Sequence, residues 1–238
     1  MKKLLTGLLF LCAGLFHFEK SYAVGLHPAT DSLKSDQLII VVTDNWNSIR
    51  ATLYCVEKIK GKWLIQFSFP AVVGSKGIAV DKIEGDMKCP AGIFHLGPAF
   101  GYADKNQAIW IRLPYIRASD TLICVDDGAS RYYNQLINSD SLPADWHSHE
   151  DMHLKDDEYK WGVFVQYNFQ PVKKGNGSCI FLHIWVKDSE GTAGCTAMEE
   201  KNLLKLLRWI QSKKNPLLVQ YPKSVYKKIA TDYNLPDL

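Results

Sequence analysis

The feature that most constrains the fold is a series of short apolar runs separated by glycine, proline or polar turns. The runs occupy residues 37–43, 49–58, 62–69, 92–96, 108–113, 122–125, 162–167 and 179–185. Many short strands without helices alternating between them are typical of antiparallel sandwiches and barrels, so we predict a mainly β fold. Lys60 and Gly61 lie between the second and third runs, which predicts a hairpin there.

One helix is predicted, over residues 199–211. Its leucines and isoleucine recur at helical spacing, and Thr196 with Glu199 resembles a capping box at its start. The side chains expected on its apolar face are Leu203, Leu206, Leu207 and Ile210. The polar segment 138–160 is too long for a hairpin loop, and we expect it to cover part of a site or a sheet edge.

The N-terminus resembles a cleaved secretory signal peptide over residues 1–23. Lys2 and Lys3 precede an apolar stretch over residues 4–16, and Ala23 ends a segment with small residues at its first and third positions. An uncleaved anchor is the alternative, but the apolar stretch is shorter than the roughly 20 residues that a bilayer span needs. A lipid-modified Cys12 would require a smaller residue than Leu11 before it. We therefore expect an exported protein whose residues 24–238 form a single domain.

Charge and composition exclude several function classes. Hydrophobic residues make up 47% of the chain and charged residues 22%, as in an ordinary globular protein. Removing residues 1–23 lowers the number of basic residues from 28 to 25 and of acidic residues from 25 to 24, so the mature net charge is +1. We expect no nucleic-acid partner and no stable membrane span after cleavage.

The mature chain has an odd number of cysteines, which in an exported protein leaves at least one thiol outside intramolecular pairs. If Cys195 is the free thiol, the other four could form two disulfides in three connectivities, or could be buried thiols; these are Cys55, Cys89, Cys124 and Cys179. No cysteine or histidine spacing favours a zinc site, and the histidines of segment 138–160 have unspecific spacing. We expect no metal and no cofactor.

Candidate catalytic residues lie in the stretch CIFLHIWVKDSEGTAGCTAM, residues 179–198. We expect His183 to lie at the end of a strand and Cys195 to lie directly before the predicted helix. The helix N-terminus would lower the pKa of the thiol, and His183 could remove its proton. Small residues in the loop would let a substrate carbonyl approach, and the amides of Gly194 and Cys195 could stabilise an oxyanion. For an isolated pair, a packed thiol and a core histidine would be the simpler interpretation.

The same stretch resembles the active-site segment of the YkuD family of L,D-transpeptidases, where a strand-borne histidine precedes a Ser/Thr-His-Gly-Cys loop and a helix. The corresponding residues here are Thr192-Ala193-Gly194-Cys195, with His183 upstream. Residues 82–103, KIEGDMKCPAGIFHLGPAFGYA, resemble a second conserved segment of one YkuD branch, and residues 159–168 resemble a third. The matches occur in the same order from about residue 76 to residue 198.

The resemblance implies a single L,D-transpeptidase-type β-sandwich domain with a helix after the catalytic cysteine. It implies an enzyme of peptidoglycan stem peptides, in which Cys195 attacks an L,D bond after meso-diaminopimelate, releases a terminal D-amino acid and passes the acyl group to an amine. Departures occur at Ala193 and Ala197, where many members have His and Arg, at Cys89, where Thr is usual, and at Met87.

Two alternative functions are compatible with the same candidate residues. In the first, water resolves the thioester, which would make the protein an L,D-carboxypeptidase or an amidase. In the second, from another class, the protein binds or organises the cell wall without catalysis, and its thiol is held in a disulfide. Glu84 and Asp86 could contact substrate, but acidic residues in a glycine-rich turn are more often simple loop residues.

Overall fold

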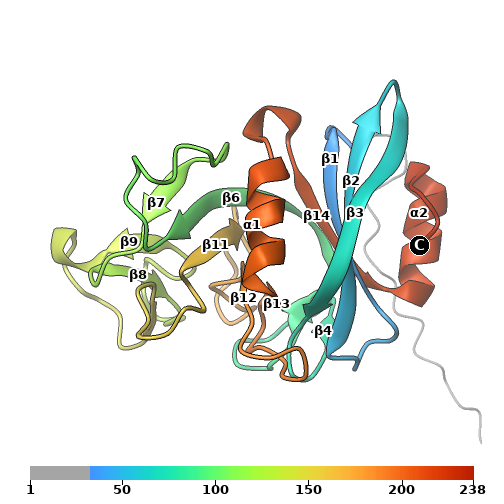
Figure 1. The fold of residues 1–238 in the computed structure, drawn as a ribbon. Helices are drawn as coiled ribbons and strands as arrows, with labels where there is room; N and C mark the ends of the chain where they lie inside the picture. The colour runs from blue at the N-terminus through green and yellow to red at the C-terminus, as the bar shows by residue number, and fades with distance from the viewer. Residues whose placement is uncertain (1–32) are drawn as a thin grey trace, which may run out of the picture.

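The computed structural model describes residues 33–238, which consist mainly of β-strands (Figure 1). The predicted signal peptide and Cys12 lie outside the described residues. The large sheet contains β1 (Gln37–Thr43), β2 (Arg50–Ile59), β3 (Lys62–Val72), β6 (Gly92–Gly101), β7 (Tyr115–Arg117), β11 (Trp161–Val165), β12 (Phe181–Ile184), β13 (Thr196–Met198) and β14 (Leu217–Pro222). The smaller sheets contain β4 (Ile78–Ala79), β5 (Cys89–Pro90), β8 (Leu122–Val125), β9 (Leu136–Asn138) and β10 (His149–Asp151). The helices are α1 (Glu200–Trp209) and α2 (Lys223–Tyr233), with 3-10 turns at Ser139–Ser141 and Ser212–Lys214.

The large sheet closes on itself through β6. The strands pair in the order β11, β12, β13, β3, β2, β1, β14 and β6, and β6 then pairs with β11 as well. The long strand β6 reaches both halves of the molecule, since its first part pairs with β14 and its second part pairs with β11 and β7. The mainly β fold predicted from the sequence is therefore confirmed, as a closed sheet of the sandwich or barrel type.

The large sheet is mostly antiparallel, as predicted, but it also contains three parallel pairs. The β2–β3 hairpin is antiparallel as expected, but β1 runs parallel to β14, β6 to β7, and β12 to β13. The β12–β13 pair is unusual because only a loop, with no helix in it, joins two neighbouring parallel strands. This pairing places the residues before β13 beside the start of β12.

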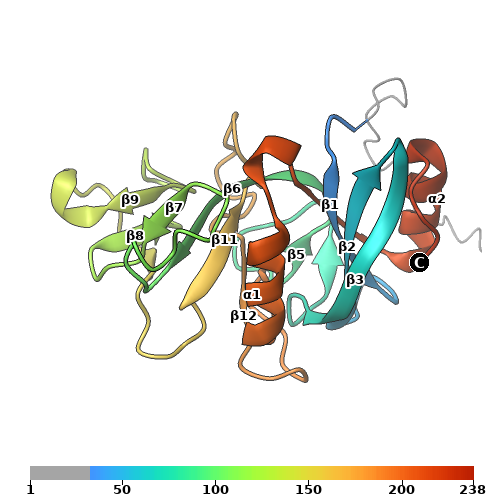
Figure 2. The same ribbon diagram turned by 45° about the horizontal axis from the view of Figure 1, so that its top comes forward.

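The core occupies the closed sheet and the surfaces that the two helices cover. Residues 38–41 of β1 are each 0% exposed, so both faces of this strand are covered. The α2 helix packs on β14 and β1, whereas α1 packs on β11 and β12 and lies between the two halves of the sheet in both views (Figures 1 and 2). The small sheet of β8, β9 and β10 extends from the side of the molecule opposite α2 (Figure 2).

Several local predictions need correction. Residues 108–113 form turns instead of the predicted strand. Ala108 and Ile111 are buried while Ile109 is 82% exposed, and a spacing of three between buried positions does not fit the alternation of a strand. The helix after Cys195 is confirmed, but no side chain caps it, and Thr196 belongs to β13. The sequence analysis missed β14 and α2, although Tyr226, Ile229 and Ala230 have the spacing of a buried helical face.

We predict that α1 contributes to stability chiefly through its buried leucines. Replacing Leu206, which is 0% exposed, with alanine should lower the free energy of unfolding by about 2–5 kcal/mol in urea denaturation. Leu64→Ala on β3 is the matched control, since Leu64 is 46% exposed and its loss should cost less than about 1 kcal/mol. Equal losses in the two variants would contradict this packing of α1.

Candidate active site

His183 in β12 and Cys195, the residue directly before β13, lie on the same face of this strand pair. In the parallel β12–β13 pair, Leu182 lies opposite Thr196 and His183 opposite Ala197. Because side chains alternate along a strand, His183 and Cys195 share the face that is turned away from the main core. Cys195 accordingly packs in a second apolar cluster that includes Phe181 and Tyr159. The predicted pair is therefore brought together by strand register.

Cys195 is a free thiol that is almost fully enclosed. It is 6% exposed, and its Sγ accepts a hydrogen bond from the Phe181 N–H at 3.2 Å and lies 3.5 Å from the Cys179 carbonyl oxygen, to which it donates. Both partners belong to the segment that begins β12. The thiol is thus fixed by the backbone of the strand that also carries His183.

A disulfide between Cys124 and Cys179 joins the small sheet to this segment. Cys124 lies in β8, and Cys179 lies two residues before β12, so the bond holds the small sheet against the face that carries Cys195. Cys55 and Cys89 are buried free thiols. Of the arrangements left open by the sequence, the structure has one disulfide, with three free cysteines among residues 33–238.

The electrostatic setting of Cys195 differs from the prediction. The helix α1 begins at Glu200, after β13, so its N-terminus does not adjoin the thiol. Burial raises the pKa of Cys195 well above its ordinary range, and Glu150 raises it further, whereas the Phe181 N–H and Lys82 act in the opposite direction. The expectation of a thiol pKa lowered by the helix was therefore wrong, and the thiol is protonated at neutral pH.

His183 is buried and neutral. It is 4% exposed, and burial lowers its pKa to about 4. Its Nδ1 donates a hydrogen bond to the Ile184 carbonyl oxygen at 2.7 Å, because a carbonyl can only accept. This bond leaves Nε2 unprotonated and able to take a proton, and it supplies the orienting acceptor that the sequence did not identify. Within the described chain, no hydrogen bond joins the ring to the Cys195 Sγ.

Tyr159 and Glu150 complete this face, and the sequence analysis gave them no role. The Tyr159 ring lies edge-on to His183, with centroids 5.2 Å apart, and its hydroxyl donates to the Glu150 Oε2 at 3.1 Å. Burial raises the pKa of Glu150 to about 7. Tyr159 belongs to the third segment of the family resemblance, whereas Glu150 lies in the polar segment 138–160 without a distinguishing signal.

The loop between the two residues is held by backbone contacts. The Ser75 N–H donates to the Thr192 carbonyl at 2.8 Å, and the Thr192 N–H donates to the Val73 carbonyl at 3.0 Å. A Cβ atom at Gly191 would lie 2.4 Å from the Ser75 Cα, so this glycine permits backbone packing. The Gly194 N–H donates to the Thr192 Oγ1 at 3.2 Å.

The acidic residues of the segment KIEGD have structural partners. Asp86 pairs with Lys82, and Glu84 accepts hydrogen bonds from the hydroxyls of Tyr133 and Ser178. These contacts fit the interpretation that both carboxylates stabilise the loop. They also reveal Lys82 as a buried cation near the site, which the sequence analysis did not single out.

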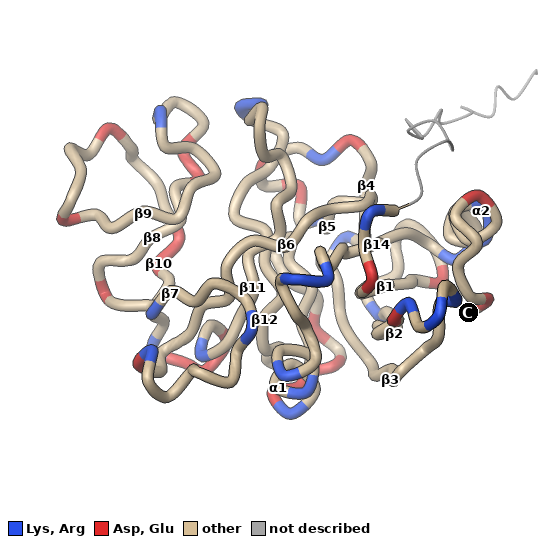
Figure 3. The backbone as a smooth tube through the Cα atoms, turned by 90° about the horizontal axis from the view of Figure 1, so that it is seen from above, with Lys and Arg blue, Asp and Glu red and all other residues tan. Residues whose placement is uncertain are grey.

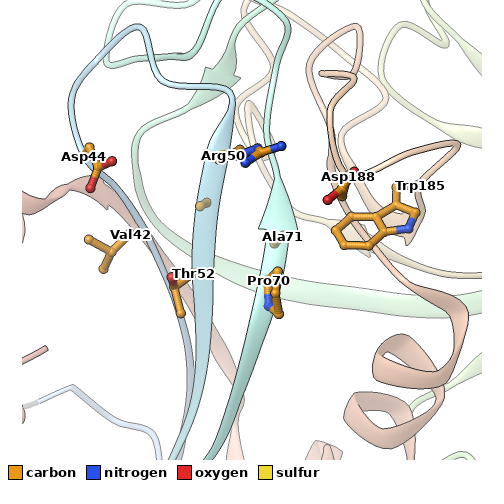
Figure 4. A pocket seen from close by; sticks show the side chains of 9 residues that line it. Val42, Asp44, Arg50, Thr52, Pro70, Ala71, Trp185 and Asp188 are labelled. Atoms are coloured by element: carbon orange, nitrogen blue, oxygen red, sulfur yellow. The ribbon is translucent and has the colours of Figure 1, made fainter.

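A separate cavity of about 320 Å³ opens beside β2 and β3 (Figure 4). Trp185 and Asp188, from the loop after β12, lie across from Arg50 and Pro70, while neither Cys195 nor His183 lines it. The cavity therefore shares the loop of the candidate site without including its reactive atoms.

Basic and acidic residues do not gather in separate regions of the described backbone. Basic and acidic positions are interspersed over the described loops (Figure 3). Two of the three histidines of segment 138–160 have acidic partners, since His149 contacts Asp151 and His153 contacts Asp120. No helix in residues 33–238 has the length and apolar character needed to cross a membrane.

We predict that Glu150→Gln accelerates alkylation of Cys195 above neutral pH. The Glu150 carboxyl is neutral below its pKa of about 7 and negative above it, where the charge opposes formation of the thiolate. Glutamine keeps an acceptor for Tyr159 but carries no charge. Iodoacetamide labelling, mapped to Cys195 by peptide mass spectrometry, should be about threefold or more faster in the variant at pH 8–9 and equal to wild type near pH 5.

The control for this experiment is Glu190→Gln, which removes an exposed carboxylate that pairs with Lys187. It should leave the rate unchanged. A Glu150→Gln profile that coincides with wild type at every pH would contradict the assigned influence of Glu150 on the thiol.

The chain is similar to one protein family and to several solved structures. The profile of the family described as YkuD, L,D-transpeptidase catalytic domain, matches residues 37–220. A comparison with curated proteins found no match. Among solved structures, the helical cell shape determining protein Pgp2 from Campylobacter jejuni is 18% identical, with a TM-score of 0.42, and the match covers 82% of this chain and 52% of that one. Bd1075 from Bdellovibrio bacteriovorus is 16% identical, with a TM-score of 0.45, and the match covers 84% of this chain and 55% of that one.

The chain thus spans about half the length of these two solved structures. The family profile covers most of the described residues and includes both members of the candidate pair, His183 and Cys195. The chain belongs to the YkuD family of L,D-transpeptidase catalytic domains.

Proposed function

We propose that the protein is an exported peptidoglycan L,D-transpeptidase in which Cys195 is the nucleophile and His183 the general base. The observation that carries the proposal is the free Cys195 thiol beside the strand of a neutral His183, inside the region that matches the family. Membership of a family that acts on peptidoglycan peptides supports the substrate class. The basic and apolar pattern of residues 1–23 supports export to the periplasm or cell wall.

The first half-reaction forms a thioester. Because both groups are neutral at rest, the Cys195 proton passes to the Nε2 of His183 as Sγ attacks the meso-diaminopimelate carbonyl carbon that is bonded to the terminal D-amino acid. The hydrogen bond from Nδ1 to the Ile184 carbonyl stabilises the imidazolium that results. His183 then returns the proton to the departing amine, and the terminal D-amino acid leaves.

The second half-reaction transfers the acyl group. An acceptor amine attacks the thioester while His183 takes a proton from it, and the C–S bond breaks as Cys195 recovers a proton. The amides of Gly194 and Cys195 are our candidates for stabilising the oxyanion, an effect worth about 3–4 kcal/mol per donor in other enzymes. The Gly194 N–H would then exchange its present bond to the Thr192 Oγ1 for one to the substrate.

Hydrolysis is the second candidate function, and two residues of the site favour it. Ala193 and Ala197 offer no polar side chain to an acceptor, and Ala197 is 0% exposed opposite His183. Water needs less orientation by the protein than a peptide amine does. In that case the same thioester would yield an L,D-carboxypeptidase.

We predict that the mature protein converts disaccharide tetrapeptide to crosslinked dimers with release of D-alanine. Cys195→Ala should lower turnover by about 10³-fold or more, because it removes the proposed nucleophile. Liquid chromatography with mass spectrometry separates the products. Cys55→Ala is the matched control, since Cys55 is also a buried free thiol but lies in the main core.

Each outcome of this assay selects one function. Tripeptide without dimer would assign the chain to the hydrolases and overturn the transpeptidase. A folded wild type that forms neither product would support the non-catalytic alternative. Full turnover by Cys195→Ala would remove the mechanism.

A further inference from the structure

Lys82 differs from an ordinary surface lysine in its burial. The residue is 4% exposed, and its side chain is only 2% exposed. Lysine is rarely buried to this extent, because removing an ammonium from water is costly unless a partner offsets the loss. The position of this ammonium within the fold therefore requires an explanation.

Two glycines make room for the Lys82 side chain next to the candidate nucleophile. A Cβ atom at Gly177 would lie 2.7 Å from the Lys82 Cε and 2.9 Å from its Cδ, so the aliphatic stem fills the space there. A Cβ atom at Gly194 would lie 3.3 Å from the Lys82 Nζ. The ammonium thus rests against the residue that directly precedes Cys195.

The ion pair with Asp86 does not fully cancel the positive charge of Lys82 on the side that faces Gly194. The Nζ donates to the Asp86 Oδ1 at 2.7 Å. The Asp86 carboxylate also accepts from the Ile83 N–H at 3.0 Å and from the Lys88 N–H at 2.9 Å. Because these amides share the negative charge, Asp86 neutralises the ammonium only in part.

The other ionisable groups that face Cys195 do not favour a thiolate. Glu150 approaches from β10 and raises the thiol pKa, as does the buried Cys89 of β5. Tyr159 is a neutral phenol, and His183 on β12 is neutral as well. Among these groups in the described chain, Lys82 supplies the positive charge.

We propose that Lys82 is a positioning residue of the acyl-transfer site, whose buried ammonium stabilises the thiolate that Cys195 becomes during attack. The proposal rests on the proposed function for the role of Cys195, but the effect on the thiol exists without substrate. The Lys82 ammonium acts on the thiolate through space, and Asp86 holds it beside Gly194. The KIEGD segment would then both form a turn and place a positive charge near the thiol.

The test is the pH dependence of Cys195 alkylation in the free protein. Lys82→Met preserves the length of the stem and removes the charge, and it should raise the thiol pKa by about one unit. The thiolate fraction then falls about tenfold at a given pH, and since a more basic thiolate is more nucleophilic, the rate should fall about threefold. Lys82→Met/Asp86→Asn, which leaves no unpaired carboxylate, should shift the thiol pKa in the same direction by a smaller amount.

Asp86→Asn alone should act in the opposite direction, because it leaves the Lys82 charge uncompensated. A lower thiol pKa and faster alkylation are expected, and this variant decides the matter if Lys82→Met does not fold. Lys214→Met is the matched control, since Lys214 pairs with Glu57 away from the site and its loss should not change the profile. An unchanged thiol pKa in the folded Lys82 variants, or in Asp86→Asn, would overturn the proposal.

Failure of this proposal and failure of the proposed function give different results. The predicted shifts together with no product from tetrapeptide would reject the enzymatic function but retain the influence of Lys82 on the thiol. Product formation that depends on Cys195, with a thiol pKa independent of Lys82, would reject only the role of Lys82.

Discussion

The parallel pairing of β12 with β13 is the constraint on which the site depends. It places His183 and Cys195 on one face of adjacent strands, although a loop of eleven residues separates them in the sequence. The loop has little freedom, because Thr192 exchanges backbone hydrogen bonds with the segment after β3. The disulfide between Cys124 and Cys179 then fixes the small sheet against the same face. The position of the thiol is thus defined by the β12–β13 pair, by the hydrogen-bonded loop between these strands and by the disulfide.

Burial determines the protonation states within this arrangement. It raises the pKa of Cys195 and lowers that of His183 to about 4, so the resting pair is neutral instead of a preformed thiolate and imidazolium. In such a pair, charge appears only as the substrate is attacked, and the surrounding fixed groups decide how far it is stabilised. Glu150 and Lys82 act on the thiol with opposite sign, and the Ile184 carbonyl orients the imidazole.

The sequence predicted most of the elements and their mostly antiparallel pairing, but it did not predict the parallel pairs. Alternation and β-branched residues located β1, the β2–β3 hairpin and β12, and leucine spacing located α1. Parallel pairing depends on which strands meet in three dimensions, so no local pattern could distinguish it. The apolar run 108–113 was wrongly predicted to be a strand, because apolar content alone does not distinguish a strand from buried turns.

The candidate pair could be predicted because a thiol and an imidazole have specific chemistry and the flanking segments match a family. Their electrostatic neighbours could not be predicted, since Lys82 and Glu150 look like loop residues until the fold buries the first and partly buries the second. The predicted capping by Thr196 was wrong because that residue begins β13 and donates its hydroxyl to the Gln220 Oε1 at 2.6 Å. Local signals therefore identify reactive groups, whereas tertiary structure sets their protonation.

The mechanism requires that Cys195 carry the acyl group during turnover. Intact-protein mass spectrometry during turnover of disaccharide tetrapeptide tests this requirement, with peptide mapping to locate the modification. We expect an adduct with the mass of the acyl portion that remains after D-alanine leaves, attached to Cys195 through a thioester that hydroxylamine cleaves. Turnover without such an adduct on rapid acid quenching, or an adduct on Cys89 instead, would contradict it.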